Sequence, residues 1–158
     1  MRWAGMRIMW SDDTPSETEV QVAALRKLGV EVERARTAEQ AHALLSNGRV
    51  FDLVILDVRL PTQEALPAEL VAIKKEFGID VGSQLNGLVI ARWLQTSGRL
   101  APYVFYTMVG EAKHRYSRAL ARLVDPEGKR FYGKQNRDYW GDGVQNLVKE
   151  ALGVNDAV

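Results

Sequence analysis

Five polar side chains each stand just after a short apolar run of the sequence. They are Asp12, Asp13, Asp57, Thr107 and Lys134. Three carboxylates gathered in one place repel each other and favour a bound cation, and Mg²⁺ prefers such oxygen ligands. An aspartate beside that cation can attack a phosphoryl group to form an acyl phosphate, while a lysine and a hydroxyl bind the phosphoryl oxygens. These residue types therefore suit phosphoryl transfer without a histidine or cysteine.

Each of these residues also has a simpler interpretation. A turn before Thr14 and Pro15 would favour aspartates at positions 12 and 13, and a lone aspartate after a strand is a common loop residue. A threonine at a strand end is a good β residue, and the four tryptophans are interpreted as packing residues. The chemical interpretation therefore depends on whether the fold brings the five side chains together.

The apolar runs themselves predict the fold class. They are rich in Val, Ile, Phe and Tyr and alternate with segments of helical periodicity, which is typical of a parallel α/β sheet. The five predicted strands are residues 6–10, 30–34, 53–58, 103–109 and 130–132. Repeated β-α units form a doubly wound sheet whose ligand site lies at the carboxyl ends of the strands. The five polar side chains stand at those ends.

Helical periodicity and end signals mark several helices. One apolar stripe consists of Val144, Leu147, Val148, Ala151 and Leu152, and another of Tyr116, Leu120, Leu123 and Val124. Thr14 and Thr37 each precede Glu or Gln by three residues, as in a capping box, and Pro15 stands at a first helical position. The predicted helix ends are Gly29, Gly48, Gly98 and Gly153.

The composition fits one domain with an ordinary hydrophobic core. The 158 residues are 46% hydrophobic and 26% charged. The absence of cysteine excludes a disulfide framework, a zinc-thiolate site and a cysteine nucleophile. The sequence has neither a signal-peptide core nor an apolar stretch of ~20 residues, so we expect a cytoplasmic protein with no membrane segment. The net charge of +1 gives no global attraction to nucleic acid or membranes.

The order of the five polar residues on successive strands resembles the receiver domain of two-component response regulators, over nearly the whole chain. The most specific part is residues 51–61, which resemble the family's phosphoacceptor strand, with Pro61 four positions after the acceptor aspartate. Residues 87–91 resemble the opening of the family's third helix. The resemblance implies a flavodoxin-like, doubly wound five-stranded parallel sheet. Residues 1–158 would then form a single receiver-like domain without an output domain.

The same resemblance implies a role for each site residue. Asp57 would be the phosphoacceptor. The Mg²⁺ ligands would be Asp12, Asp13, Asp57 and the backbone carbonyl of Arg59. Thr107 would be the switch hydroxyl, Lys134 would contact the phosphoryl group, and Phe131 would be the aromatic side chain whose rotamer follows phosphorylation. The protein would be a signalling receiver that catalyses its own aspartyl phosphorylation and dephosphorylation, and otherwise not an enzyme.

The largest departure from the family pattern is an insertion. About twenty more residues than usual separate Pro61 from Gly87, so residues 62–86 are interpreted as an insertion within the domain. Apolar residues at helical spacing in residues 67–78 predict an extra short helix between the third strand and the third helix. The insertion could cover Asp57 or bind a partner.

Two further departures lie close to the predicted site. Met108 follows Thr107 where receivers usually have a small residue, so entry to the phosphoryl site would be narrower. Gln135 follows Lys134 where the family has a cis proline, and a cis bond without proline costs about 3 kcal/mol. Either this bond is trans, which could place Lys134 differently, or the strain is retained.

A receiver without an effector signals by contact with other proteins. The resemblance implies a histidine kinase or phosphotransfer protein as one partner and an unidentified downstream protein as another, and it leaves a homodimer open. We expect no nucleic acid partner, because the basic run is most simply a solvated helix face; a groove for an acidic partner or nucleic acid is the alternative. The run consists of Lys113, His114, Arg115, Arg118 and Arg122.

Two other functions stay open from the sequence. The first is a receiver-like interaction module that keeps the fold but is never phosphorylated, which Met108, Gln135 and the insertion favour. The second is a metal-dependent phosphatase or other hydrolase that uses the same carboxylates. It has less support, because the sequence offers no identifiable general acid or water-activating residue.

Overall fold

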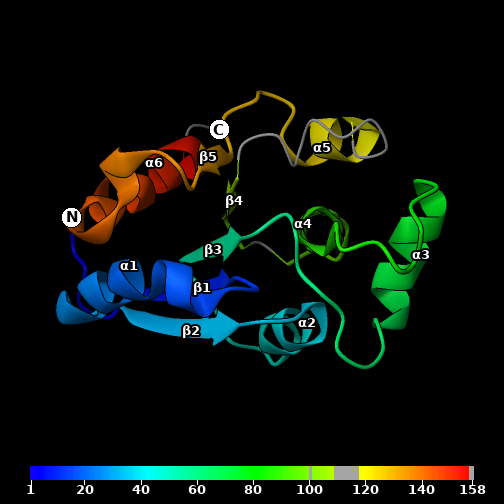
Figure 1. Ribbon diagram of the computed structural model, residues 1–158, viewed down its shortest axis with the longest axis horizontal. Helices are drawn as coiled ribbons and strands as arrows, with labels where there is room; N and C mark the ends of the chain where they lie inside the picture. The colour runs from blue at the N-terminus through cyan, green and yellow to red at the C-terminus, as the bar shows by residue number, and fades with distance from the viewer. Residues whose placement is uncertain (100, 109–117, 157–158) are drawn as a thin grey trace.

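Five parallel strands form the centre of the protein. The computed structural model describes residues 1–99, 101–108 and 118–156, arranged as Figure 1 shows. The strands are β1 (Arg7–Ser11), β2 (Glu31–Ala35), β3 (Leu53–Leu56), β4 (Tyr103–Thr107) and β5 (Phe131–Gly133). They pair in parallel in the order β2-β1-β3-β4-β5. The predicted five-stranded parallel sheet is confirmed, and each strand begins within one residue of its predicted start.

The strands differ in burial according to their place in the sheet. Every residue of β3 and β4 is buried, whereas the edge strands β2 and β5 are partly exposed. Helices cover both faces of a parallel sheet, so its inner strands carry nearly continuous apolar runs rather than an alternating pattern. This explains why the runs were visible in the sequence.

Helices lie on both faces of the sheet, as predicted for a doubly wound, flavodoxin-like fold. The helices of one face are α1 (Pro15–Lys27) and α6 (Val144–Asp156). Those of the other face are α2 (Ala38–Ser46), α4 (Asn86–Thr96) and α5 (Arg118–Val124). Figure 1 shows the two groups on opposite sides of the strands. Two short 3-10 helices, η3 (Arg137–Tyr139) and η4 (Gly141–Gly143), lead from β5 into α6.

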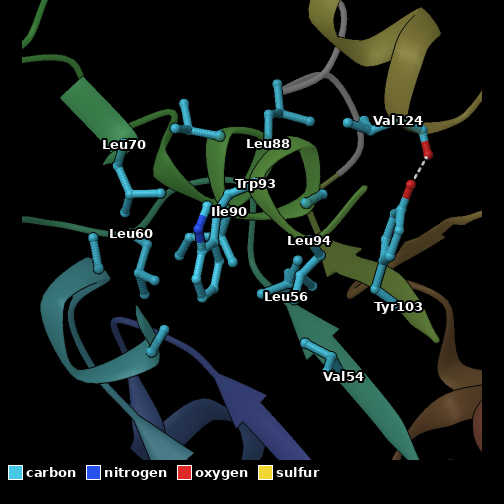
Figure 2. Close-up of a cluster of buried hydrophobic side chains, with 14 of the residues drawn as sticks. Val54, Leu56, Leu60, Leu70, Leu88, Ile90, Trp93, Leu94, Tyr103 and Val124 are labelled. Atoms are coloured by element: carbon cyan, nitrogen blue, oxygen red, sulfur yellow. Dashed lines mark hydrogen bonds between the residues drawn. The ribbon is translucent and has the colours of Figure 1, made fainter. Parts of the chain in front are cut away.

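The larger hydrophobic cluster lies between the sheet and the α2, α4 and α5 side. Figure 2 shows Val54 and Leu56 of β3 facing the apolar side of α4. Tyr103 of β4 reaches α5, where its hydroxyl donates a hydrogen bond to the Val124 carbonyl at 2.6 Å. Its buried oxygen therefore has a partner, as a buried polar atom requires.

The extra helix predicted within residues 67–78 is confirmed as α3 (Ala68–Glu76). It packs on α4, on the side away from the sheet, and so adds a further layer at the edge of the molecule (Figure 1). Leu70 and Ile73 of α3 are buried in the same cluster as α4. Full burial of one leucine side chain contributes about 1.5–3 kcal/mol, so α3 is an integral part of the packed structure.

The segment after α3 returns to the loop that follows β3. The Leu60 N–H donates to the Gln84 carbonyl at 2.9 Å, and Leu60 forms an isolated parallel bridge with Leu85. The Asn86 side-chain amide donates to the Leu60 carbonyl at 2.5 Å. The end of residues 62–86 is therefore hydrogen-bonded to the loop that carries Asp57.

Lys74 of α3 is fully buried. Its ammonium donates to the carbonyls of Val81 at 2.9 Å and Ser83 at 2.5 Å. Burial lowers the pKa of Lys74 to about 8, although the carboxylate of Asp80 opposes this shift. Lys74 therefore links α3 to the segment that contains Val81 and Ser83, at the cost of removing its charge from water.

The structure corrects two details of the predicted helices. Gly153 lies inside α6 rather than at its end, because a helix continues through a glycine at a cost of about 1 kcal/mol. Leu123 is 42% exposed, since the buried side of α5 is set by Leu120 and Val124. Among the described residues, no helix combines the length and apolar character needed to cross a membrane.

The two predicted capping threonines behave differently. Thr37 caps α2 by accepting from the Gln40 N–H at 3.2 Å. Thr14 occupies the corresponding position before α1, but its hydroxyl donates to Asp13 Oδ1 at 3.2 Å instead. Arg118 and Arg122 are exposed, as a solvated face requires. Tyr116 and the remainder of the basic run, Lys113, His114 and Arg115, lie outside the described residues.

Candidate functional site

Three aspartates meet at the carboxyl ends of β1 and β3. The backbone pairing of the sheet extends to them: the Asp57 N–H donates to the Ser11 carbonyl at 3.1 Å, and the Asp12 N–H donates to the Ala35 carbonyl at 2.9 Å. One carboxylate oxygen each from Asp12, Asp13 and Asp57 lie within 4.8 Å of one another. The sheet register therefore creates the carboxylate group that the sequence predicted.

Asp57 is held between a hydroxyl and an ammonium group. Thr107 Oγ1 donates to Asp57 Oδ1 at 2.8 Å, and Lys134 Nζ donates to Asp57 Oδ2 at 2.7 Å. The same Nζ also reaches Asp12 Oδ1 at 3.3 Å and lies 3.8 Å from Glu17 Oε2. Side chains from the ends of β1, β3, β4 and β5 thus converge on one point.

Burial and neighbouring charges together shift the pKa values of Asp57 and Lys134. Asp12 and Asp57 are 1% and 5% exposed, whereas Asp13 is exposed. Burial raises the pKa of the Asp57 carboxyl, although Lys134 and the Thr107 hydroxyl oppose the shift. Burial by itself would lower the pKa of Lys134, but the carboxylates of Asp57 and Asp12 outweigh it and hold that pKa above its ordinary value. Lys134 is therefore a permanent positive charge at neutral pH.

The peptide bond between Lys134 and Gln135 is trans. The Lys134 N–H donates to the Thr107 carbonyl at 2.8 Å, and the Lys134 carbonyl accepts from Trp140 Nε1 at 2.7 Å. These two hydrogen bonds fix the backbone on either side of the lysine. Its side chain therefore reaches Asp57 without the cis bond of the family pattern.

Gly87 brings the first turn of α4 against the backbone of Asp57. Its N–H donates to the Val58 carbonyl at 3.0 Å. A Cβ at position 87 would lie 1.9 Å from the Asp57 carbonyl oxygen, well inside van der Waals contact. Only glycine fits at position 87, because the backbone of α4 lies so close to the Asp57 carbonyl. This contact determines where the Asp57 loop lies relative to α4.

The remaining predicted residues surround this centre. Arg59 is exposed in the loop after β3. Phe131 is half-buried and stacks on Phe105 of β4, with ring centroids 4.5 Å apart and an interplanar angle of 17°. Met108 is 51% exposed and lines a cavity of about 570 Å³ together with Lys134. Met108 thus lies beside Lys134 in a cavity whose lining does not include the aspartates.

The donor set of the three aspartates fits a magnesium ion. All the grouped ligand atoms are carboxylate oxygens, which Mg²⁺ prefers over nitrogen or sulfur. Three carboxylates beside one ammonium leave net negative charge at the site. Asp13 is exposed, so water would be able to reach an ion held by these residues. Asp12, Asp13 and Asp57 are therefore the residues that would hold the ion.

Sequence reasoning missed several residues next to the site, among them Thr18, Arg34 and Trp140. The Thr18 hydroxyl donates to Asp12 Oδ2 at 3.0 Å, and Arg34 donates to that hydroxyl. Trp140, interpreted as a packing residue, is 49% exposed and bonds the Lys134 carbonyl. Thr18 had a weak signal, as a hydroxyl in the first turn of the helix that follows the acidic pair. Arg34 had none, because its contact depends on how β2 lies beside α1.

Comparisons with known proteins give structural matches only. No family model matches the sequence, and no curated protein matches it either. The response regulator receiver domain protein (CheY-like) from Methanospirillum hungatei JF-1 is 18% identical, with alignment over 96% of this chain and 96% of that chain and a TM-score of 0.62. The non-phosphorylated HemR receiver domain from Leptospira biflexa is 20% identical, over 97% and 96%, with a TM-score of 0.61.

A third similar structure is the response regulator protein TrrA from Thermotoga maritima, crystallised in complex with Mg²⁺-BeF. It is 23% identical, over 92% of this chain and 98% of that chain, with a TM-score of 0.57. In all three cases the alignment spans nearly the whole of both chains, including the sheet and the helices on both faces. The chain therefore has the fold of a response regulator receiver domain.

Proposed function

We propose that this protein is a phosphorylatable switch of a two-component or phosphorelay pathway, with Asp57 as the phosphoacceptor. The observation that carries the proposal is the position of the Asp57 carboxylate, 2.8 Å from Thr107 Oγ1 and 2.7 Å from Lys134 Nζ, beside Asp12 and Asp13. A nucleophile, two groups that bind phosphoryl oxygens and a set of metal ligands are thereby gathered at one edge of the sheet.

The proposed step is attack by an Asp57 carboxylate oxygen on the phosphorus of a phosphohistidine in a kinase or phosphotransfer protein. A P–O bond forms, the P–N bond breaks, and the leaving imidazole nitrogen keeps the electron pair and takes up a proton. Lys134 and Thr107 then bind the phosphoryl oxygens. Mg²⁺ held by Asp12, Asp13, Asp57 and the Arg59 carbonyl would neutralise charge on the transferred group. Water later cleaves the acyl phosphate and restores the carboxylate.

The switch would act through the hydroxyl of Thr107 and the aromatic ring of Phe131. Thr107 now bonds Asp57, and bonding to a phosphoryl oxygen instead would displace the end of β4. Phe131 stacks on Phe105, two residues before Thr107 on that strand, so movement of β4 would change the packing of Phe131. A downstream protein that binds one of the two states more tightly would read this change.

The alternative function is a receiver-like interaction module that is not phosphorylated. One observation favours it: Asp57 is only 5% exposed, and Thr107 and Lys134 occupy one carboxylate oxygen each. A phosphodonor must therefore displace or bypass contacts that already exist.

The deciding experiment is incubation of the protein with Mg²⁺ and either a small acyl phosphate or beryllofluoride. We expect a mass increase of one phosphoryl group with the acyl phosphate and a change in Trp fluorescence with both reagents. Asp57→Asn should abolish both signals. Asp52→Asn is the matched control, because Asp52 lies at the opposite end of β3, where its carboxylate accepts from the Arg7 N–H at 2.8 Å. Identical behaviour of wild type and Asp57→Asn would contradict the switch and favour the interaction module.

A further inference from the structure

The carboxylate of Asp12 is held from behind by a hydroxyl. Thr18 is 1% exposed, and its Oγ1 donates to Asp12 Oδ2 at 3.0 Å. The other oxygen, Oδ1, accepts from the Thr14 N–H at 2.9 Å and faces Lys134 at 3.3 Å. The two oxygens therefore have different partners: Oδ2 is bonded to α1 through Thr18, and Oδ1 faces Lys134.

The direction of the Thr18 hydroxyl is set by Arg34 of β2. Arg34 Nη2 donates to Thr18 Oγ1, and Nη1 donates to the Pro15 carbonyl at 3.2 Å. A guanidinium has donors only, so the Thr18 oxygen must accept from it and the hydroxyl proton is left for another acceptor. Two acceptors lie within reach, Asp12 Oδ2 at 3.0 Å and the Pro15 carbonyl at 3.5 Å. Asp12 is the closer of the two and carries a negative charge, so the proton is directed to Asp12.

The same arrangement places a positive charge behind the carboxylate. Arg34 is partly buried, and burial lowers the pKa of its guanidinium, although the carboxylate of Asp12 opposes that shift. An arginine remains charged throughout the ordinary pH range. The positive guanidinium of Arg34 is therefore separated from the Asp12 carboxylate only by the Thr18 hydroxyl, which bonds both.

We propose that Thr18 and Arg34 are positioning residues of the magnesium site. They fix the plane of the Asp12 carboxylate so that Oδ1 faces Lys134, which also bonds Asp57, before the ion arrives. This inference rests on the proposed function, since it assumes that Asp12 is a metal ligand. Residues that orient a ligand in this way typically change metal affinity by 10- to 100-fold when they are lost.

The test is the affinity for Mg²⁺ alone, measured by calorimetry and by Trp fluorescence. Trp10 is a convenient reporter, because it is 1% exposed and stands two residues before Asp12 on β1. Thr18→Val should weaken Mg²⁺ binding by about 10-fold or more. Thr18→Ser should restore the affinity, because serine supplies the same hydroxyl; a residue needed only for packing would not be rescued in this way.

Arginine variants test the second step. Arg34→Met should weaken Mg²⁺ binding less than Thr18→Val, because the hydroxyl remains but can turn to Pro15. Combining the two changes should weaken binding no further than Thr18→Val, since Arg34 acts through Thr18. Arg26→Met is the matched control: Arg26 also joins α1 to β2, by donating to the Val32 carbonyl at 2.9 Å, and should leave the affinity unchanged.

Each outcome distinguishes this inference from the proposed function. If wild type and Arg26→Met bind Mg²⁺ and Thr18→Val binds equally well, the positioning role is wrong and the metal site stands. If wild type itself does not bind Mg²⁺, both proposals fail. Urea unfolding without Mg²⁺ shows which variants are folded. If Thr18→Val does not fold, the Mg²⁺ affinities of Arg34→Met and Thr18→Ser decide whether the positioning role is correct. Unchanged affinity in Arg34→Met would then overturn the inference.

Discussion

At the scale of single residues, both backbone contacts and side-chain hydrogen bonds fix the position of Asp57. Its carboxylate bonds Thr107 and Lys134, while its carbonyl lies against Gly87 at the start of α4. The second contact carries no charge, yet it decides how closely α4 approaches the acceptor loop. A site of this kind is sensitive to volume as well as to chemistry.

Gly87→Ala should therefore disturb the site without removing any functional group. The added Cβ would overlap the Asp57 carbonyl oxygen, so the loop or the helix must shift, at a cost of about 1–3 kcal/mol. We expect a lower midpoint of urea unfolding and a weaker fluorescence response to Mg²⁺ with beryllofluoride. Gly82→Ala is the control, because a Cβ there meets only Asp80 Oδ1, at 3.6 Å. Wild-type behaviour of Gly87→Ala would show that α4 does not constrain Asp57.

At the scale of elements, residues 62–86 are anchored at several points rather than looped out. Glu39 of α2 accepts from the N–H groups of Gln63 and Glu64, at 3.0 and 2.7 Å. Glu69 of α3 accepts from Trp93 Nε1 of α4 at 2.7 Å. These bonds, with those to Leu60, tie the segment to α2, α4 and the acceptor loop. The segment is therefore expected to contribute to global stability.

Leu70→Ala tests whether α3 is part of the cooperative fold. Leu70 is fully buried, and leucine-to-alanine changes at such positions cost about 2–5 kcal/mol. We expect a fall of that size in the free energy of unfolding by urea, with the Asp57-dependent beryllofluoride response retained. Lys75→Ala, an exposed position on the same helix, should change stability by less than about 0.5 kcal/mol. Equal stability of the two variants would mean that α3 is not packed on α4 as described.

At the scale of the whole molecule, stability responds to pH through individual charges whose pKa differs between the folded protein and the unfolded chain. Lys74 is one such charge, enclosed between α3 and the carbonyls of Val81 and Ser83. Its pKa is about 8 in the folded protein against an ordinary value of 10.5. Between these two values the unfolded chain binds a proton that the folded protein does not.

Stability relative to a Lys74→Met variant should therefore rise with pH. Unfolding takes up a proton at Lys74 in this window. From pH 7 to pH 10, the free energy of unfolding of wild type should therefore rise by about 2 kcal/mol relative to that of Lys74→Met. Below pH 8 the cost of burying the charge is fully present. The same comparison with Lys75→Met, an exposed neighbour, should be flat. A flat profile for Lys74→Met as well would show that its ammonium is solvated.

Much of this protein is determined by local pattern. Apolar runs marked all five strands, and helical spacing marked α3 and the buried stripe of α6, because burial on a sheet or against one face imposes a fixed period on the sequence. Once the strands are parallel, their carboxyl ends share one edge. That geometry is why Asp12, Asp57 and Thr107 could be grouped before their distances were known.

Tertiary structure decided what depends on contacts between distant segments. Lys134 reaches Asp57 through a trans bond because Thr107 and Trp140 hold its backbone. Thr18 meets Arg34 only where α1 crosses β2. Local periodicity contains no information on such encounters, since they depend on the register and packing of elements far apart in the chain. The carboxylate cluster with Thr107 and Lys134 could thus be predicted from sequence, but the contacts of Arg34 and Trp140 behind it could not.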